Sequence, residues 1–96
     1  MVLFDWDETK DRANQRKHGV SFETATLVFD DPHALMLQDR IENGEERWQA
    51  IGRITDAVVL VVAHTVKPRL EGEVIRIISA RKAERNERKR YEDQAY

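Results

Sequence analysis

The pattern of hydrophobic and polar positions predicts three helices and five strands along the chain. Residues 2–6 alternate between apolar and polar side chains, which indicates a short first strand. Residues 8–18 are mostly polar and predict a surface helix, because the Asp7 carboxylate can cap its first turn and Gly19 suits the left-handed position after its last turn. A second, short helix is expected over residues 22–29, where apolar side chains recur at helical spacing.

The rest of the chain predicts four strands and one more helix. Residues 57–65 are almost continuously apolar and rich in β-branched side chains, a composition typical of a central strand. Residues 67–72 are polar, contain Pro68 and are interpreted as a loop. A C-terminal helix is expected over residues 84–93. The other strands are expected over residues 34–38, 46–54 and 73–81.

This order of elements favours an α+β fold. Two helices come before four consecutive strands, so we expect a small, mostly antiparallel sheet with two N-terminal helices and one C-terminal helix packed on one of its faces. A chain of 96 residues fits a single domain, which we expect to span residues 1–96.

The distribution of charge adds a candidate binding surface. The chain is 41% hydrophobic and 35% charged, and its formal net charge is −2 at pH 7. Residues 81–90 nevertheless hold six basic and two acidic side chains, whereas residues 1–80 hold ten basic and 14 acidic ones. Such a local basic cluster suits a phosphate backbone or a strongly acidic protein. Its basic members are Arg81, Lys82, Arg85, Arg88, Lys89 and Arg90.

Composition also limits the cellular environment and the kinds of bound metal or cofactor that we expect for this protein. The chain has no cysteine, which excludes disulfides and cysteine zinc sites and fits a reducing cytoplasm. Its longest apolar run, residues 57–63, is too short to span a bilayer, and its first residues lack the pattern of a signal peptide, so no membrane partner is expected. The three histidines lie far apart without metal-ligand spacing, so neither a metal nor a cofactor is expected.

Two blocks of sequence carry a more specific signal. The first is Lys17-His18-Gly19-Val20-Ser21-Phe22, and the second is Ile77-Ile78-Ser79-Ala80-Arg81-Lys82-Ala83. Together with Phe4-Asp5-Trp6-Asp7 near the start, they give the chain a pattern that resembles the BrnT family of bacterial type II toxins. The resemblance implies a RelE-like fold and a ribonuclease activity directed against translation.

Two places depart from the family pattern: the loop over residues 67–72 is slightly long, and position 84 holds a different residue type. The place of Glu84 is commonly taken by a hydroxyl residue, which would form a capping box with Glu87 at the start of the last helix. We therefore expect the box to be lost and Asn86 to cap that helix instead.

The resemblance implies a metal-independent endoribonuclease. In such an enzyme arginine stabilises charge on the reacting phosphate, while a histidine or a carboxylate transfers protons. The candidate catalytic residues are His64, Arg76, Arg81 and Tyr91, and the candidate RNA-binding residues are Lys82, Arg85, Arg88 and Lys89.

Each catalytic candidate also has a structural alternative. His64 could be a partly buried histidine bonded to a neighbouring carbonyl group, and Arg76 could form an ion pair with Glu46 or Glu73. Arg81 could cap nearby carbonyl groups.

The candidates on the last helix have alternatives as well. Tyr91 could stack on an RNA base or could pack the helix onto the sheet. Arg85, Arg88 and Lys89 fall at helical spacing and could form either an RNA-binding stripe or a solvated face.

His64 and Arg81 are expected to converge, because each stands near the end of a predicted strand. On that basis, alanine at either position is predicted to abolish growth inhibition without unfolding the domain.

The function expected from the resemblance is a ribonuclease toxin of a type II toxin–antitoxin system. Its partners would be an RNA substrate and a BrnA-like antitoxin with a DNA-binding module, and operator DNA would be bound only through the complex of the two proteins. One alternative is a catalytically inactive module of the same fold that binds nucleic acid or antitoxin. Another is a small interaction domain whose basic helix binds an acidic protein.

Overall fold

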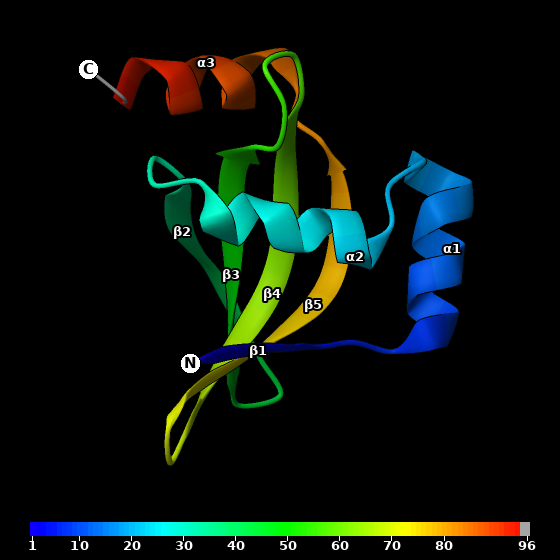
Figure 1. Ribbon diagram of the computed structural model, residues 1–96, viewed down its shortest axis with the longest axis vertical. Coiled ribbons are helices and arrows are strands. Elements are labelled where there is room, and N and C mark those ends of the chain that lie inside the picture. Colours follow the sequence, from blue (N-terminus) through cyan, green and yellow to red (C-terminus); the bar gives the residue numbers. More distant parts are fainter. Residues whose placement is uncertain (95–96) are drawn as a thin grey trace.

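The computed structural model of the protein describes residues 1–94, which form one five-stranded sheet with helices on both of its faces (Figure 1). The elements are β1 (Val2–Asp5), α1 (Glu8–His18), α2 (Phe22–Ala25), the 3-10 helix η1 (Thr26–Asp30), β2 (Leu35–Glu42), β3 (Glu45–Arg53), β4 (Val59–Arg69), β5 (Gly72–Lys82) and α3 (Arg85–Gln94).

The sheet is mixed, in the strand order β1-β5-β4-β3-β2. Strand β1 runs parallel to β5, and the other neighbours are antiparallel. The α+β class and the central position of β4 are therefore confirmed. The parallel edge was not predicted, because short local sequence signals do not reveal which strand β1 will pair with.

Local capping signals set the ends of the N-terminal helices. Asp7 accepts hydrogen bonds from the backbone amides of Thr9 and Lys10 at 2.8 and 3.1 Å, and Gly19 ends α1 with a φ of 71°. The helix predicted over residues 22–29 is divided, because the α-helical part ends at its first turn and η1 continues as a 3-10 helix.

The last helix keeps half of a capping box. The Glu87 carboxylate accepts a hydrogen bond from the backbone amide of Glu84 at 2.8 Å. Asn86 lies inside the first turn of α3, so the prediction that it caps this helix is wrong.

The predicted loop over residues 67–72 is mostly strand, and only Leu70 and Glu71 form the turn. Strands β4 and β5 stay paired as far as Arg69 and Gly72, with Pro68 inside the ladder. Proline is tolerated there because β3 pairs with β4 only as far as His64, which leaves this part of β4 with a free edge. The hairpin extends beyond the body of the sheet (Figure 1), and its exposure accounts for the polar composition that suggested a loop.

The two faces of the sheet are covered differently. Helices α1, α2 and η1 cover the helix face, where Phe22 and Val62 belong to the main core. Helix α3 lies at one end of the strands and covers that end of the opposite face through Tyr91, which packs with Val61. The expectation that all helices pack on one face is wrong: both faces of β4 are apolar, so both need a cover.

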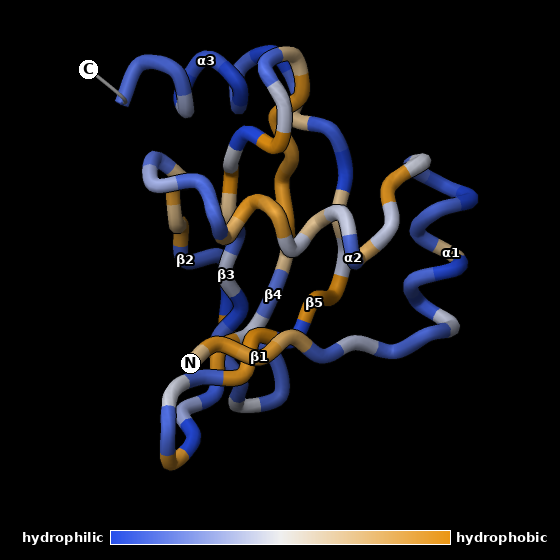
Figure 2. The backbone as a smooth tube through the Cα atoms, in the orientation of Figure 1, coloured by the Kyte–Doolittle hydropathy of each residue, from blue (hydrophilic) through white to orange (hydrophobic). Residues whose placement is uncertain are grey.

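Helix α1 is attached to the sheet by buried polar side chains, since it is hydrophilic along most of its length (Figure 2). The Asn14 side-chain amide donates to the carbonyl groups of Val20 and Ala80 at 2.9 and 2.7 Å and accepts from the Ala80 backbone amide at 3.2 Å. The Asp11 carboxylate accepts from the Phe22 backbone amide at 2.8 Å. None of the helices within residues 1–94 is long and apolar enough to cross a membrane.

Candidate functional site

The open face is the face of the sheet opposite α1 and α2. Because residues paired across neighbouring strands point to the same side, rows of side chains cross this face from β3 through β4 to β5. The first row lies under α3, and the other two lie further along the strands. The rows are Ile51–Val61–Arg81, then Gln49–Ala63–Ser79, then the pair Thr65–Arg76, and Arg47 points to the same face from β3.

A β-bulge at Ile78 determines what this face displays. The pairing of β5 with β4 shifts between Ser79, which lies opposite Ala63, and Ile77, which lies opposite His64. In a regular strand, residues five positions apart point to opposite faces. The extra residue at the bulge shifts the alternation of side chains by one position, so that Arg76 and Arg81 both point to the open face.

Each arginine of the open face has a carboxylate partner. Arg76 meets Asp5 at 2.7 Å, and Arg81 makes two hydrogen bonds to Glu87 at 2.7 and 2.9 Å. The hydrogen bonds from Arg81 hold the pKa of the Glu87 carboxyl below its ordinary value, although partial burial opposes them. The face therefore presents two arginines that are each paired with a carboxylate group.

Arg47 completes this set on β3. Its Nε atom lies 3.1 Å from a carboxylate oxygen of Glu42, the last residue of β2. Thr65 is 1% exposed, and its hydroxyl has no hydrogen-bond partner within residues 1–94. Thr65 pairs with Arg76 across β4 and β5, so a buried, unpaired hydroxyl lies beside an arginine of the open face.

His64 lies on the other side of the sheet, on the helix face. It is 2% exposed, its Nδ1 lies 3.1 Å from the Val62 carbonyl oxygen, and its ring meets Phe29 edge to face at 4.9 Å. Burial lowers the pKa of His64, and the contact with the Val62 carbonyl opposes this only in part, so the imidazole is neutral at pH 7. This geometry matches the structural alternative.

The predicted convergence of His64 and Arg81 is wrong. Arg81 lies opposite Val61, three residues before His64, and Val61 and His64 point to opposite faces of β4. The physical reason is strand alternation, which a proposal based only on nearness to strand ends did not include.

Tyr91 is buried between α3 and the sheet. Its hydroxyl donates a hydrogen bond to the Asp31 carboxylate at 2.5 Å, and the Arg53 guanidinium lies 5.7 Å from its ring centroid. Burial and the bond to Asp31 raise the pKa of the phenol. Tyr91 packs the helix onto the sheet, as its structural alternative supposed, and its ring is not available to an RNA base in this arrangement.

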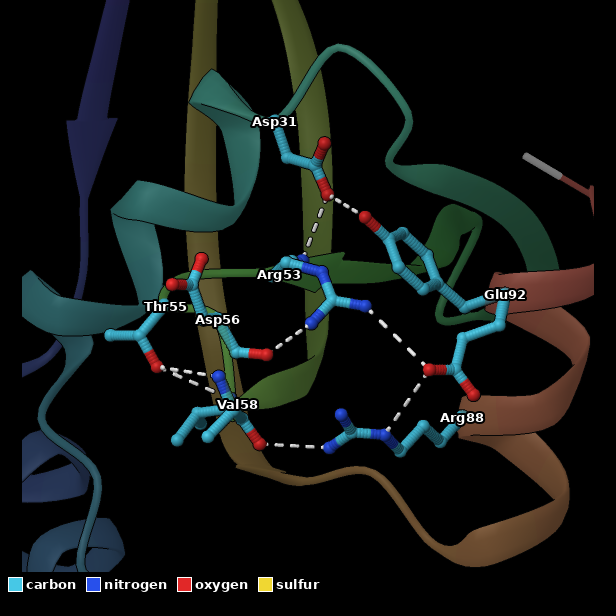
Figure 3. A network of polar contacts seen from close by, with 9 residues as sticks. Asp31, Arg53, Thr55, Asp56, Val58, Arg88 and Glu92 are labelled. Atoms are coloured by element: carbon cyan, nitrogen blue, oxygen red, sulfur yellow. Dashed lines mark hydrogen bonds and ion pairs between the residues drawn. The ribbon is translucent and has the colours of Figure 1, made fainter. Parts of the chain in front are cut away.

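The predicted RNA-binding residues do not form one surface. Lys82 pairs with Leu60 and so belongs to the helix face, and Arg85 is exposed on α3. Arg88 donates to the Ala57 carbonyl at 2.8 Å and meets Glu92 at 3.6 Å (Figure 3). Lys89 pairs with Asp93 at 2.7 Å. The basic cluster of the sequence is thus divided, and Arg88 serves to hold α3 against the turn before β4.

Sequence reasoning missed Arg47 and Thr65 as members of this site. A signal for Arg47 was present, since the alternation of β3 places it on the face opposite Trp48. No local signal marks Thr65, whose position depends on long-range pairing. Within residues 1–94, no three histidine, cysteine or acidic side chains are grouped so that they could hold a metal ion.

The family model of the ribonuclease toxin BrnT of type II toxin–antitoxin systems matches residues 6–87. The chain belongs to the BrnT family. Its members are ribonuclease toxins, so this BrnT chain is a ribonuclease toxin of a type II toxin–antitoxin system. A comparison with curated proteins gives no match.

The fold of this BrnT chain is similar to a solved structure. The crystal structure of the ribonuclease toxin BrnT of Brucella abortus aligns with a TM-score of 0.64 at 24% sequence identity. The alignment covers 88% of this chain and 99% of the other. At this identity the likeness supports the shared fold and carries no residue roles.

Proposed function

We propose that this BrnT toxin cleaves RNA on the open face of its sheet, with Arg76 and Arg81 binding the phosphates. One observation carries the proposal: the bulge at Ile78 turns both arginines to the open face, of which α3 covers only the end that carries Arg81. Between their rows lie the short or polar side chains of Ala63 and Ser79, which leave room for a backbone to approach.

Arg47 supplies a further donor for the same strand of RNA. Arginine binds phosphate oxygens with two parallel hydrogen bonds and stays charged, which suits the negative charge that develops on a phosphorane. This arrangement stabilises the transition state through fixed donors.

The proton transfers are assigned to the carboxylates that hold the arginines. Asp5, Glu42 and Glu87 lie against Arg76, Arg47 and Arg81 respectively. A carboxylate beside a bound phosphate can accept the proton of the 2′-hydroxyl as the 2′-oxygen bonds to phosphorus. The same carboxyl group can then give that proton to the 5′-oxygen as its bond to phosphorus breaks, without a metal ion. His64 is excluded from this role by its burial on the helix face.

The remaining candidate residues take supporting roles. Lys82, Arg85 and Lys89 attract RNA through their charge, and Arg88 and Tyr91 fix α3 beside the site. In the cell we place this metal-independent endoribonuclease in the cytoplasm, where its RNA cleavage inhibits translation. A relationship to RelE-like toxins and a BrnA-like antitoxin that carries the DNA-binding module both remain predictions.

The decisive experiment compares arginine variants. Arg76→Ala and Arg81→Ala are each expected to lower the rate constant of RNA cleavage by about 100-fold to 1,000-fold, the usual effect of removing one transition-state donor. Arg16→Ala is the matched control, because this exposed arginine lies on α1 and its loss should leave the rate within about twofold. Wild-type cleavage by both open-face variants would refute the assignment.

Two further measurements distinguish this proposal from a metal-dependent nuclease and from an inactive RNA-binding module. Cleavage that persists in the presence of a chelator supports the metal-independent mechanism, whereas cleavage restored only by added Mg²⁺ contradicts it. Steeply salt-dependent binding of RNA that stays intact would favour the inactive binding module.

A further inference from the structure

A pocket of about 730 Å³ opens on the helix face, on the side of the sheet away from the open face. Its floor is formed by the first residues of β3 and β5, the second half of β4, and η1. Met36 is 45% exposed and Val66 is 36% exposed, so apolar side chains stand uncovered at its mouth. Its apolar lining residues are Phe29, Met36, Trp48, Val66, Pro68 and Ile75.

The polar lining of this pocket is acidic. Glu45, Glu46 and Glu73 line it together with a single lysine, Lys67, which lies 3.3 Å from Glu45. His64 also lines it and adds no charge, because burial lowers its pKa below the ordinary 6.5. The pocket therefore keeps a negative charge at pH 7.

This chemistry differs from that of the open face. A polyanion such as RNA is repelled by a pocket of negative charge, whereas the arginines of the open face attract it. Exposed apolar side chains surrounded by acidic ones fit a protein segment that is both apolar and cationic.

We propose that the pocket anchors a cationic, apolar segment of the cognate antitoxin. Lysine or arginine side chains of that segment meet Glu46 and Glu73, while its apolar side chains pack between Met36 and Val66. The proposal rests on the family membership, which requires an antitoxin, and is independent of where RNA is cleaved. Antitoxin and RNA then bind opposite faces of the same sheet.

The test measures binding of purified cognate antitoxin to the full-length toxin by isothermal titration calorimetry. The variant with Glu46→Lys and Glu73→Lys is expected to bind roughly tenfold more weakly or worse, because like charges then face each other. The control carries Glu23→Lys and Asp30→Lys, two exposed acidic residues outside the pocket that change the net charge equally. The control should bind like the wild type.

A second variant tests the apolar part without changing charge. Met36→Gln and Val66→Gln together are also expected to weaken antitoxin binding, because both side chains are exposed in the free toxin and can be replaced without unfolding it. Wild-type affinity in both pocket variants would overturn the proposal.

RNA cleavage and self-association identify the other possible occupants. Both pocket variants should cleave RNA at the wild-type rate, and loss of cleavage would instead place substrate in the pocket. A toxin dimer that dissociates on the Met36 and Val66 changes would show a second copy there, which also overturns the proposal. The arginine variants of the open face leave antitoxin affinity unchanged, so the two proposals fail separately.

Discussion

The hydroxyl of Tyr91 and the carboxylate of Asp31 meet at 2.5 Å, although 60 residues separate them in the chain. This contact joins α3 to the segment that leaves η1, and the same carboxylate oxygen accepts from the Arg53 backbone amide at 2.8 Å. Figure 3 shows the wider network, in which Arg53 and Arg88 both approach Glu92. The position of the last helix therefore depends on polar contacts as much as on apolar packing.

Removing the Tyr91–Asp31 contact is predicted to lower the stability of the fold without lowering the rate of RNA cleavage. Tyr91→Phe keeps the buried ring and removes one hydrogen bond to a charged group, so the free energy of unfolding should fall by about 1.5–3 kcal/mol. Urea denaturation measures this change. The rate constant of RNA cleavage, measured well below the melting temperature, should stay at the wild-type value.

A double-mutant cycle with Asp31→Asn checks that the two residues act through each other. The two single changes should not be additive, because they remove the same contact. A Tyr91→Phe variant that is fully stable but no longer cleaves RNA would contradict this prediction and indicate a catalytic role for Tyr91.

The burial of His64 predicts a structural role for this residue. His64→Ala removes an imidazole ring that is 2% exposed and packed against Phe29, and the cavity should lower the free energy of unfolding by about 2–4 kcal/mol. His33→Ala is the control, since His33 is exposed and its loss should change stability by less than about 0.5 kcal/mol. A stable His64→Ala variant that no longer cleaves RNA would contradict the structural role.

His64 also predicts how stability depends on pH. Burial lowers its pKa below the ordinary 6.5, so in the window below pH 6.5 the unfolded chain binds the proton more readily than the folded one. The free energy of unfolding should therefore decrease as the pH falls from 6.5 towards the pKa of the folded protein. Thermal melts of the wild type and of His64→Gln across this range measure the effect, and an equal slope in both proteins would refute it.

Local patterns were sufficient where short-range chemistry decides the structure. The cap at Asp7, the left-handed Gly19 and the apolar central strand all depend on neighbouring residues, and all three are observed. The extended hairpin around Pro68 was missed because its polar composition indicates only that the segment is exposed to solvent. An exposed strand and an exposed loop have the same polar composition.

The candidate site was predicted in part. Arg76 and Arg81 stood out because arginine is unusual in or beside an apolar strand, and both lie on the open face. His64 was misplaced because the sequence around it does not show that η1 covers the helix face, where Phe29 packs against its ring.

The sequence by itself determined the α+β class, most element boundaries and the family to which the toxin belongs, because these follow from local periodicity, capping and short motifs. Only the tertiary structure decided that β1 joins β5 in parallel, that a bulge at Ile78 brings Arg76 and Arg81 to one face, and that Glu87 holds Arg81. Each of these depends on pairing between distant segments, in which a shift of one residue moves every later side chain to the other side of the sheet.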